Sequence, residues 1–118
     1  MIRFLVTGAN GDIAEGISRI LKKYFSNSLI HGTDCLGKWP GNFYFSKIYK
    51  SPHASSKEYL EFLKKKYKKY DLIIPTTEQE IFAISKSDIS KEKILINSKK
   101  ITDIFLDKLK SCNFLNKK

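Results

Sequence analysis

The sequence predicts an α/β fold, arranged as a three-layer α/β/α sandwich around a mostly parallel sheet. Two observations predict it. Short apolar runs alternate along the chain with stretches in which apolar residues recur at helical spacing. The first apolar run, residues 2–6, ends at a glycine-containing turn that leads into a helical stretch, as a buried strand followed by a helix would. The length of 118 residues fits one domain.

Each remaining element is predicted from its own pattern. We expect strands at residues 2–6, 28–34, 43–49, 71–75 and 94–97, the third of them at an edge of the sheet. We expect helices at residues 12–25, after a cap at Ser55 or Ser56, after a capping box of Thr77 and Glu80, and at residues 99–115. The expected strand order is 3-2-1-4-5, which places a ligand crevice at the carboxyl ends of strands 1 and 4.

The turn after the first strand is the strongest candidate for ligand contact. Gly8, Ala9, Asn10 and Gly11 lie there, and small residues let backbone N–H groups approach an anion at the positive end of a helix. The same residues also suit close packing of the helix on the sheet. With the alternating pattern, this turn is typical of a Rossmann-like domain. The full dinucleotide fingerprint requires a glycine where Asn10 stands, so that version of the motif is not met.

Two carboxylates extend the candidate site. Asp34 ends the second strand, where Rossmann proteins keep an acid for a ribose hydroxyl, although an acid there also caps the following turn. Glu78 lies in the first turn of the helix after Pro75, where the helix dipole favours an acid with or without a ligand. Glu78 and Glu80 are two residues apart and do not face each other, which argues against a paired acid and base.

The net charge of +10 raises the question of a nucleic-acid partner. The densest basic cluster is residues 64–69, and on a helix Leu60, Leu63, Tyr67 and Tyr70 would form an apolar stripe with the lysines on the remaining, solvated surface. No recognised reader motif accompanies these lysines, so we expect no nucleic-acid binding. The two cysteines, Cys35 and Cys112, have no metal-ligand spacing, and we expect both to be free thiols.

Four segments occur in order along the chain and together span nearly all of it: VTGANGDIAEGI, IHGTD, DLIIPTTEQEI and FLDKLKSCNFL. This ordered set resembles the ATP-grasp superfamily, in particular its carbamoyl-phosphate-synthase-like branch. The resemblance implies that residues 1–98 form a pre-ATP-grasp, Rossmann-like domain. It implies that residues 99–118 are the start of the ATP-grasp domain, truncated after its first helix.

The resemblance also implies a function. Members of this superfamily phosphorylate a carboxylate with ATP and let an amine or ammonia displace the phosphate. In relatives, a lysine at the place of Lys108 contacts the ATP phosphates. The chain would then be the substrate-side domain of such a ligase and inactive alone. Its cofactors, ATP and Mg²⁺, would be held only by the full-length protein, and none is expected on this chain.

The alternative is the N-terminal NAD(P)-binding domain of a short-chain reductase or sugar-nucleotide epimerase. The looser glycine motif of those enzymes fits Gly8 and Gly11, but Ala14 takes its third place. Their catalytic tyrosine is followed by a lysine four residues later, and none of the six tyrosines is.

The expected surroundings follow from the same reading. We expect a cytoplasmic protein without a membrane span, because no apolar run approaches the ~20 residues that a span requires. The expected partners are the remainder of its own ATP-grasp chain, a small-molecule carboxylate or amine, and, as an open question, a second copy of the chain.

Overall fold

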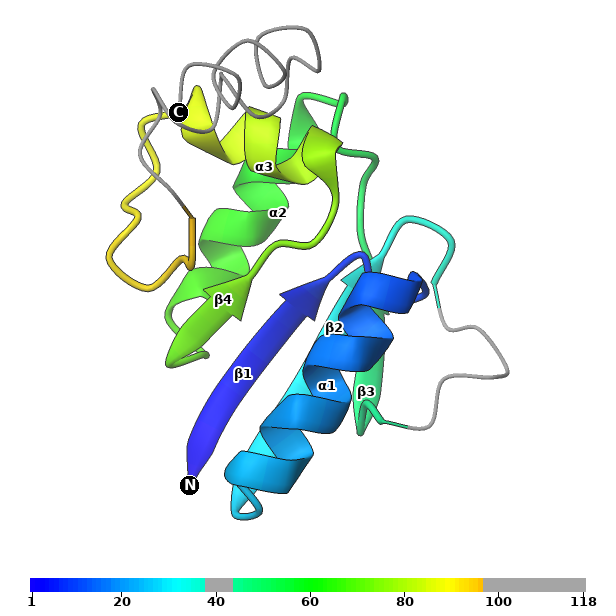
Figure 1. The fold of residues 1–118 in the computed structure, drawn as a ribbon. Coiled ribbons are helices and arrows are strands. Elements are labelled where there is room, and N and C mark those ends of the chain that lie inside the picture. The colour runs from blue at the N-terminus through cyan, green and yellow to red at the C-terminus, as the bar shows by residue number, and fades with distance from the viewer. Residues whose placement is uncertain (38–43, 97–118) are drawn as a thin grey trace, which may run out of the picture.

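The computed structural model describes residues 1–37 and 44–96, which form a parallel sheet with helices on both faces (Figure 1). The strands are Ile2–Thr7 (β1), Ser28–Asp34 (β2), Lys47–Lys50 (β3) and Leu72–Ile74 (β4), and the helices are Asp12–Tyr24 (α1), Glu58–Tyr67 (α2) and Glu78–Ser85 (α3). The strand order is β3-β2-β1-β4, with all pairs parallel. The predicted fold class is confirmed.

A fifth strand is present only as a single contact in the described residues. Ile94 forms one parallel bridge to Ile73, on the side of β4 away from β1. This is the place that the predicted order 3-2-1-4-5 gives to strand 5. The expected strand at residues 94–97 is therefore right in position and reduced to one bridge in the part that the structure describes.

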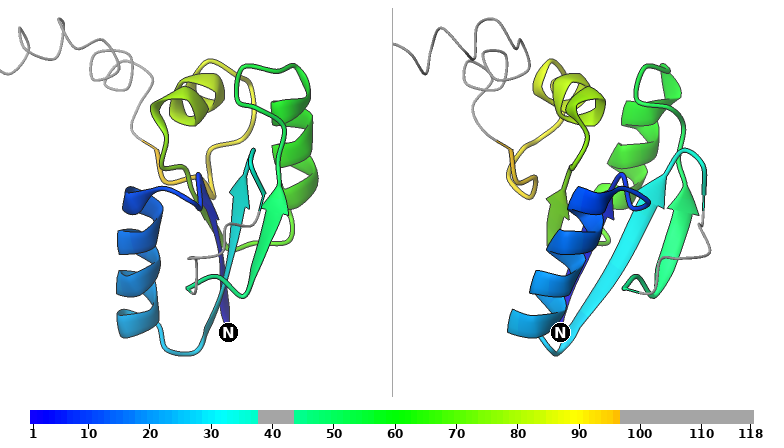
Figure 2. Two further views of the ribbon diagram at one scale, coloured as in Figure 1. Left: turned by 90° about the vertical axis from the view of Figure 1, so that its right-hand side faces the viewer. Right: turned by 45° about the vertical axis from the view of Figure 1, so that its right-hand side comes forward.

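Alternating side chains on β1 divide the core into two layers. Phe4 and Val6 point to one face, where α1 packs, and Leu5 points to the other, where α2 and α3 pack. Figure 2 shows α1 and α2 on opposite sides of the sheet. Because the first helix and the later ones use different faces, both faces of β1 are buried, as expected of a central strand in a parallel sheet.

The third strand begins later than predicted. It was expected at residues 43–49, and β3 runs from Lys47 to Lys50. Phe45, which the alternation placed inside the strand, instead turns into the core with 8% of its surface exposed. Ser46 N–H bonds Ile30 O at 3.0 Å, so the chain joins the sheet edge only at that point. Phe43 lies outside the described residues.

The cap of α2 also differs from the prediction. The residue before the helix is Lys57, without a side-chain capping bond. Ser55 Oγ instead pairs with His53 Nδ1 at 2.9 Å, and Ser56 N–H bonds His53 O, which makes a tight turn ahead of the helix. The predicted apolar stripe does face the core: Leu63 and Tyr70 are buried, and Leu60 and Tyr67 pack against the same cluster. Tyr59, 1% exposed, is a further buried residue of α2 that the prediction did not include.

An ion pair ties the start of β4 to β1. Asp71 Oδ2 accepts the Arg3 backbone N–H at 2.8 Å and faces Arg3 Nε at 3.5 Å. The Arg3 backbone N–H, followed by its side chain, lowers the pKa of Asp71 below its ordinary value of 3.8.

Replacing Asp71 by Asn should therefore change the acid sensitivity of the fold. A carboxyl group with a lowered pKa stabilises the folded state above its unfolded pKa, and this stabilisation is lost as the pH falls through the folded pKa. Melting temperatures of wild type and Asp71→Asn, measured from pH 7 to pH 2, should converge at the acid end. Asp88→Asn is the control, because the Asp88 side chain is 95% exposed and should follow the wild-type curve. A constant difference between wild type and Asp71→Asn would contradict this account.

None of the described helices combines the length and the apolar character that crossing a bilayer requires.

Candidate functional site

The candidate site lies at the carboxyl ends of β1, β2 and β4, where the predicted segments converge. Thr7 ends β1 and Asp34 ends β2, and their residues pair side by side up to Thr7 and Thr33. Pro75 follows β4 on the other side of β1 and leads into α3. The topology thus brings together three segments that are up to about 70 residues apart in the chain.

The glycine turn is tight and closes on itself. Gly8 has φ +63°, the left-handed region that favours glycine. Gly11 N–H bonds Gly8 O at 3.0 Å. Gly11 then acts as the N-terminal cap of α1 with extended backbone and no capping side chain. The conformation of the turn is therefore fixed by the fold itself, independently of any ligand.

The backbone N–H groups of this turn already have partners inside the protein. Ala9 N–H bonds Thr33 O at 3.0 Å, and Asn10 N–H bonds Asp34 Oδ2 at 3.1 Å. Asn10 also donates from Nδ2 to Gly37 O at 2.8 Å, while its Oδ1 is buried and has no hydrogen-bond partner in the described structure. A ligand at Ala9 or Asn10 would have to displace an internal acceptor.

Asp34 serves both as a turn cap and as a link to the glycine turn. Its Oδ1 accepts the Leu36 N–H at 3.0 Å, which closes the turn after β2, and its Oδ2 accepts the Asn10 N–H. The contacts therefore show that Asp34 caps the turn after β2. Both carboxylate oxygens are engaged with backbone groups, so a ribose hydroxyl would have to share them.

The segment after β4 packs directly on Gly8. Thr76 Oγ1 donates to Thr7 O at 2.6 Å, and Thr76 N–H donates to Thr7 Oγ1 at 3.3 Å. A Cβ at Gly8 would lie 2.6 Å from Thr76 Oγ1 and 2.7 Å from Thr77 Cγ2. Gly8 is thus required by its conformation and also by the close approach of this segment.

Thr77 caps α3 as predicted, but the capping box closes differently. Thr77 Oγ1 accepts the Glu80 N–H at 3.2 Å. The Glu80 carboxylate, instead of returning to the backbone of Thr77, accepts from Thr77 Oγ1 at 2.9 Å and from Tyr59 OH at 2.5 Å. Glu80 is only 7% exposed. In the described ranges it has no ion pair, so these two hydroxyls are what hold its carboxylate.

Tyr59 is the partner that sequence reasoning missed. Its ring is 1% exposed in the core of the α2 face, and its hydroxyl reaches the carboxyl edge of the sheet. Burial, then the charge of Glu80 and the hydrogen bond to it, raise the pKa of Tyr59 above its ordinary value of 10.0. The hydroxyl therefore stays protonated and acts as a donor. The signal in the sequence was the four-residue spacing of Tyr59 and Leu63, which fits a helix face as well as the predicted stripe does.

The predicted candidates are only partly brought together. Gly8, Ala9, Asn10, Gly11 and Asp34 form one hydrogen-bonded unit. Glu78 is exposed in the first turn of α3, and it is Glu80, not Glu78, that approaches Gly8: a Cβ on Gly8 would be 3.4 Å from Glu80 Oε1. Lys108 and the expected domain boundary after residue 98 lie outside the described residues, as does the expected thiol at Cys112. The other, Cys35, is free and exposed.

Comparison with known proteins gives a distant likeness to solved structures. No protein-family model matches the chain. No curated protein matches it either. Among solved structures, it is similar to a dTDP-glucose 4,6-dehydratase from Bacillus anthracis str. Ames, solved in complex with NAD, with 15% sequence identity and a TM-score of 0.46. The match covers 92% of this chain and 49% of the dehydratase, so the chain spans about half the length of that enzyme.

Proposed function

We propose that this chain is the Rossmann-like, substrate-side domain of a larger carboxylate–amine ligase of the ATP-grasp type. The proposal rests on one observation: three segments whose order resembles that superfamily meet at one edge of the sheet. Gly8 of the first segment packs against Thr76 and Thr77 of the third, and Asn10 bonds Asp34 of the second. Each segment alone gives only a weak resemblance, but together the three form one continuous edge of the sheet.

In this proposal, this edge of the sheet positions the acceptor substrate. Asn10 supplies an unpartnered buried amide oxygen, and the first turn of α1 begins at Gly11 without a capping side chain. The N–H groups of such a first turn favour an anion such as a carboxylate, in competition with Asp12 and Glu15 of the same turn, whereas the Asn10 oxygen, which accepts hydrogen bonds, suits an N–H group of an amine. Within residues 1–37 and 44–96, no three His, Cys, Asp or Glu side chains come together as metal ligands. In this proposal Lys108 is the residue that contacts the ATP phosphates.

A second candidate is an NAD(P)-binding domain, as in the alternative reading of the sequence. The strand order, the positive φ of Gly8 and the acid at the end of β2 favour it. The contacts of the turn count against it. Asn10 stands in place of a fingerprint glycine, and its N–H is held by Asp34, the residue that would bind the ribose.

Titration with reduced nicotinamide cofactors separates the two candidates. NADH and NADPH fluorescence should not change on mixing with the chain at micromolar concentration. The full-length protein should release ADP from ATP only when both a carboxylate and an amine are supplied, tested with a panel of amino acids and ammonium. Saturable micromolar NADH binding would overturn the ligase proposal in favour of the dinucleotide candidate. ADP release that is independent of both substrates would overturn it in favour of neither.

A variant at the edge tests whether the glycine turn contacts the substrate. Gly11 is exposed with φ −86°, so leucine fits the backbone there. In the full-length protein, Gly11→Leu should raise the KM of the acceptor about tenfold or more, which corresponds to about 1.4 kcal/mol of lost binding. Lys23→Leu, at the other end of α1, is the control and should leave KM unchanged. Equal kinetics in both variants would remove the turn from the site.

A further inference from the structure

Two lysines converge on one tyrosine ring at the β3 edge of the sheet. The Lys66 ammonium nitrogen lies 3.4 Å from the centroid of the Tyr49 ring, and the Lys47 ammonium nitrogen lies 4.6 Å from the same centroid. Lys47 and Tyr49 are two residues apart on β3, so their side chains lie on one face of the sheet. Lys66 reaches them from the last turn of α2. Two positive charges from different elements therefore meet at one place.

The tyrosine ring that the two lysines share is held by packed aromatic side chains. His31 on β2 meets the Tyr49 ring edge-on, with the ring centroids 5.8 Å apart, and it meets the Tyr70 ring in the same way at 5.7 Å. His31 Nδ1 also lies 2.8 Å from the Tyr70 hydroxyl, and Tyr70 is only 2% exposed. The core thus fixes the surface on which the ammonium groups lie.

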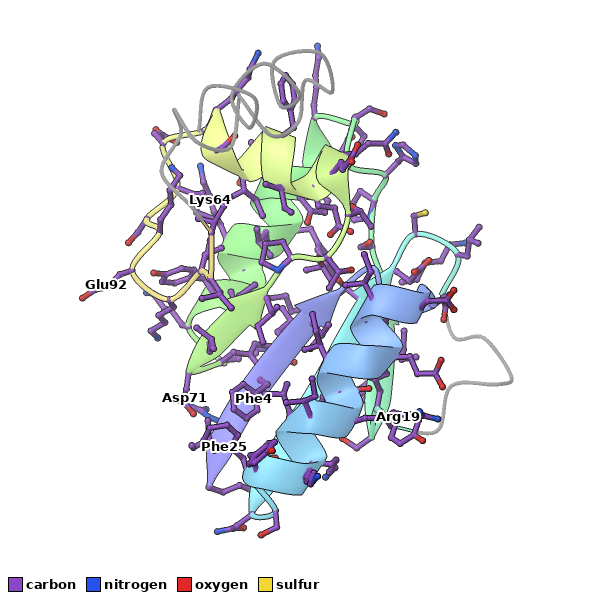
Figure 3. The ribbon with its side chains drawn as sticks, in the orientation of Figure 1. Phe4, Arg19, Phe25, Lys64, Asp71 and Glu92 are labelled. Atoms are coloured by element: carbon purple, nitrogen blue, oxygen red, sulfur yellow. The ribbon has the colours of Figure 1, made fainter. Side chains whose placement is uncertain are left out.

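No carboxylate in the part of the chain that the structure describes forms an ion pair with Lys47 or Lys66. Lys64, on the same helix, shows the contrast. Figure 3 shows Lys64 on α2 next to the segment that follows α3, and its ammonium nitrogen lies 3.8 Å from carboxylate oxygens of Glu61 and Asp88. The charge at the Tyr49 ring is therefore available to an anion from solution.

We propose that Lys47, Lys66 and the Tyr49 ring form a binding site for a single phosphate group of a small molecule. Two ammonium groups at one place suit a dianion, and a phosphate monoester carries a charge of about −1.5 to −2 at neutral pH. Lysine binds phosphate as a point charge with three N–H donors.

This phosphate site is separate from the candidate site at the glycine turn. Lys47 begins β3 and pairs with His31, in the middle of β2, whereas Asp34 at the end of β2 pairs with Lys50. The two lysines therefore lie short of the strand ends that carry the glycine turn, and the proposal does not depend on the ligase function.

His31 should report on an anion at this site. Burial, then the charges of Lys47 and Lys66, lower the pKa of His31 below its ordinary value of 6.5. A dianion between the two lysines would offset their charges and favour the protonated imidazole, so the pKa of His31 should rise when the site is filled.

Titration of the 118-residue chain with inorganic phosphate tests the site by NMR. The measurement is made at about pH 8, where phosphate is a dianion, with the ionic strength held constant by chloride. The amide signals of β3 and of the last turn of α2 should shift and saturate. Lys47→Gln and Lys66→Gln should each weaken the affinity about tenfold, as expected when one hydrogen bond between charged groups is lost.

Lys65→Gln is the matched control for these variants. It removes the same charge from the exposed neighbour of Lys66 on α2 and should keep the wild-type affinity for phosphate. Equal affinities in Lys65→Gln and Lys66→Gln would contradict the proposal. So would a single-stranded DNA oligonucleotide that binds and loses equal affinity in both variants, since the whole basic surface of α2 would then bind a polyanion.

The histidine signals give a second measurement that requires no variant. Sulfate is the probe, because it stays a dianion over the whole range in which histidine titrates. In sodium sulfate, compared with sodium chloride of equal ionic strength, the pKa of His31 should rise by about one pH unit. His53, which precedes the other end of α2, is the internal control and should give the same curve in both salts. A His31 curve that is identical in the two salts would overturn the proposal.

Discussion

Replacing Gly8 by alanine is expected to lower the free energy of unfolding by about 2–5 kcal/mol. An L-residue in the left-handed region costs roughly 1–2 kcal/mol, and overpacking adds about 1–3 kcal/mol. The overpacking is hard to relieve, because the Cβ would lie 2.6 Å from Thr76 Oγ1, which is itself bonded to Thr7 O. The melting temperature should fall by roughly 10–25 °C, measurable by circular dichroism.

The control for this variant is Gly16→Ala. Gly16 lies within α1, and a Cβ there would have no atom within 4 Å apart from its chain neighbours and the backbone of its own helix. Alanine there should stabilise the protein by about 0.5–1 kcal/mol, because glycine is unfavourable inside a helix. If Gly8→Ala and Gly16→Ala shifted stability in the same direction, the close approach of the Thr76 segment to the glycine turn would be wrong.

Removing the Tyr59 hydroxyl should have the second large effect. In Tyr59→Phe, the buried Glu80 carboxylate loses the donor that lies 2.5 Å from its Oε2 and keeps Thr77. Hydrogen bonds to charged groups contribute about 1.5–3 kcal/mol, and the loss should approach that range because both Tyr59 and Glu80 are buried. Urea denaturation measures the change.

A double-mutant cycle with Glu80→Gln isolates this bond. The double variant should lose less than the sum of the two singles, since the interaction can be lost only once. Simple additivity would mean that the hydroxyl and the carboxylate act independently. The raised pKa of Tyr59 gives a further readout: because the folded pKa lies above 10.0, stability should be lost as the pH rises beyond that value. Tyr59→Phe should remove this part of the alkaline loss.

Much of the fold could be predicted from local pattern. The bounds of β2 were predicted correctly at residues 28–34. Thr77 was correctly predicted as the cap of α3, because a threonine three residues before a glutamate is the pattern of a capping box at the start of a helix. The central position of β1 followed from the order of elements and the short connections between them.

The site was less predictable, because tertiary contacts decide it. The sequence analysis named Glu80 only as a member of the capping box and chose Glu78 for the site. Because carboxylates are rarely buried, nothing in the local pattern indicated that Glu80 would be. Only the rotation of α2, set by which of its faces meets the sheet, brings the Tyr59 hydroxyl to that carboxylate. The cap at Ser55 or Ser56 failed for a similar reason: His53 forms a turn with these serines before the helix begins.

The central place of β1 has a consequence for folding during synthesis. β1 is synthesised before the other described strands, and β2 follows soon enough for the β1–α1–β2 unit to form locally. The other edge of β1 pairs with Leu72–Ile74, so its unpaired N–H and C=O groups stay exposed until β4 has also been synthesised. Open strand edges are templates for pairing between chains, so nascent chains of this protein are most prone to associate with one another in that interval.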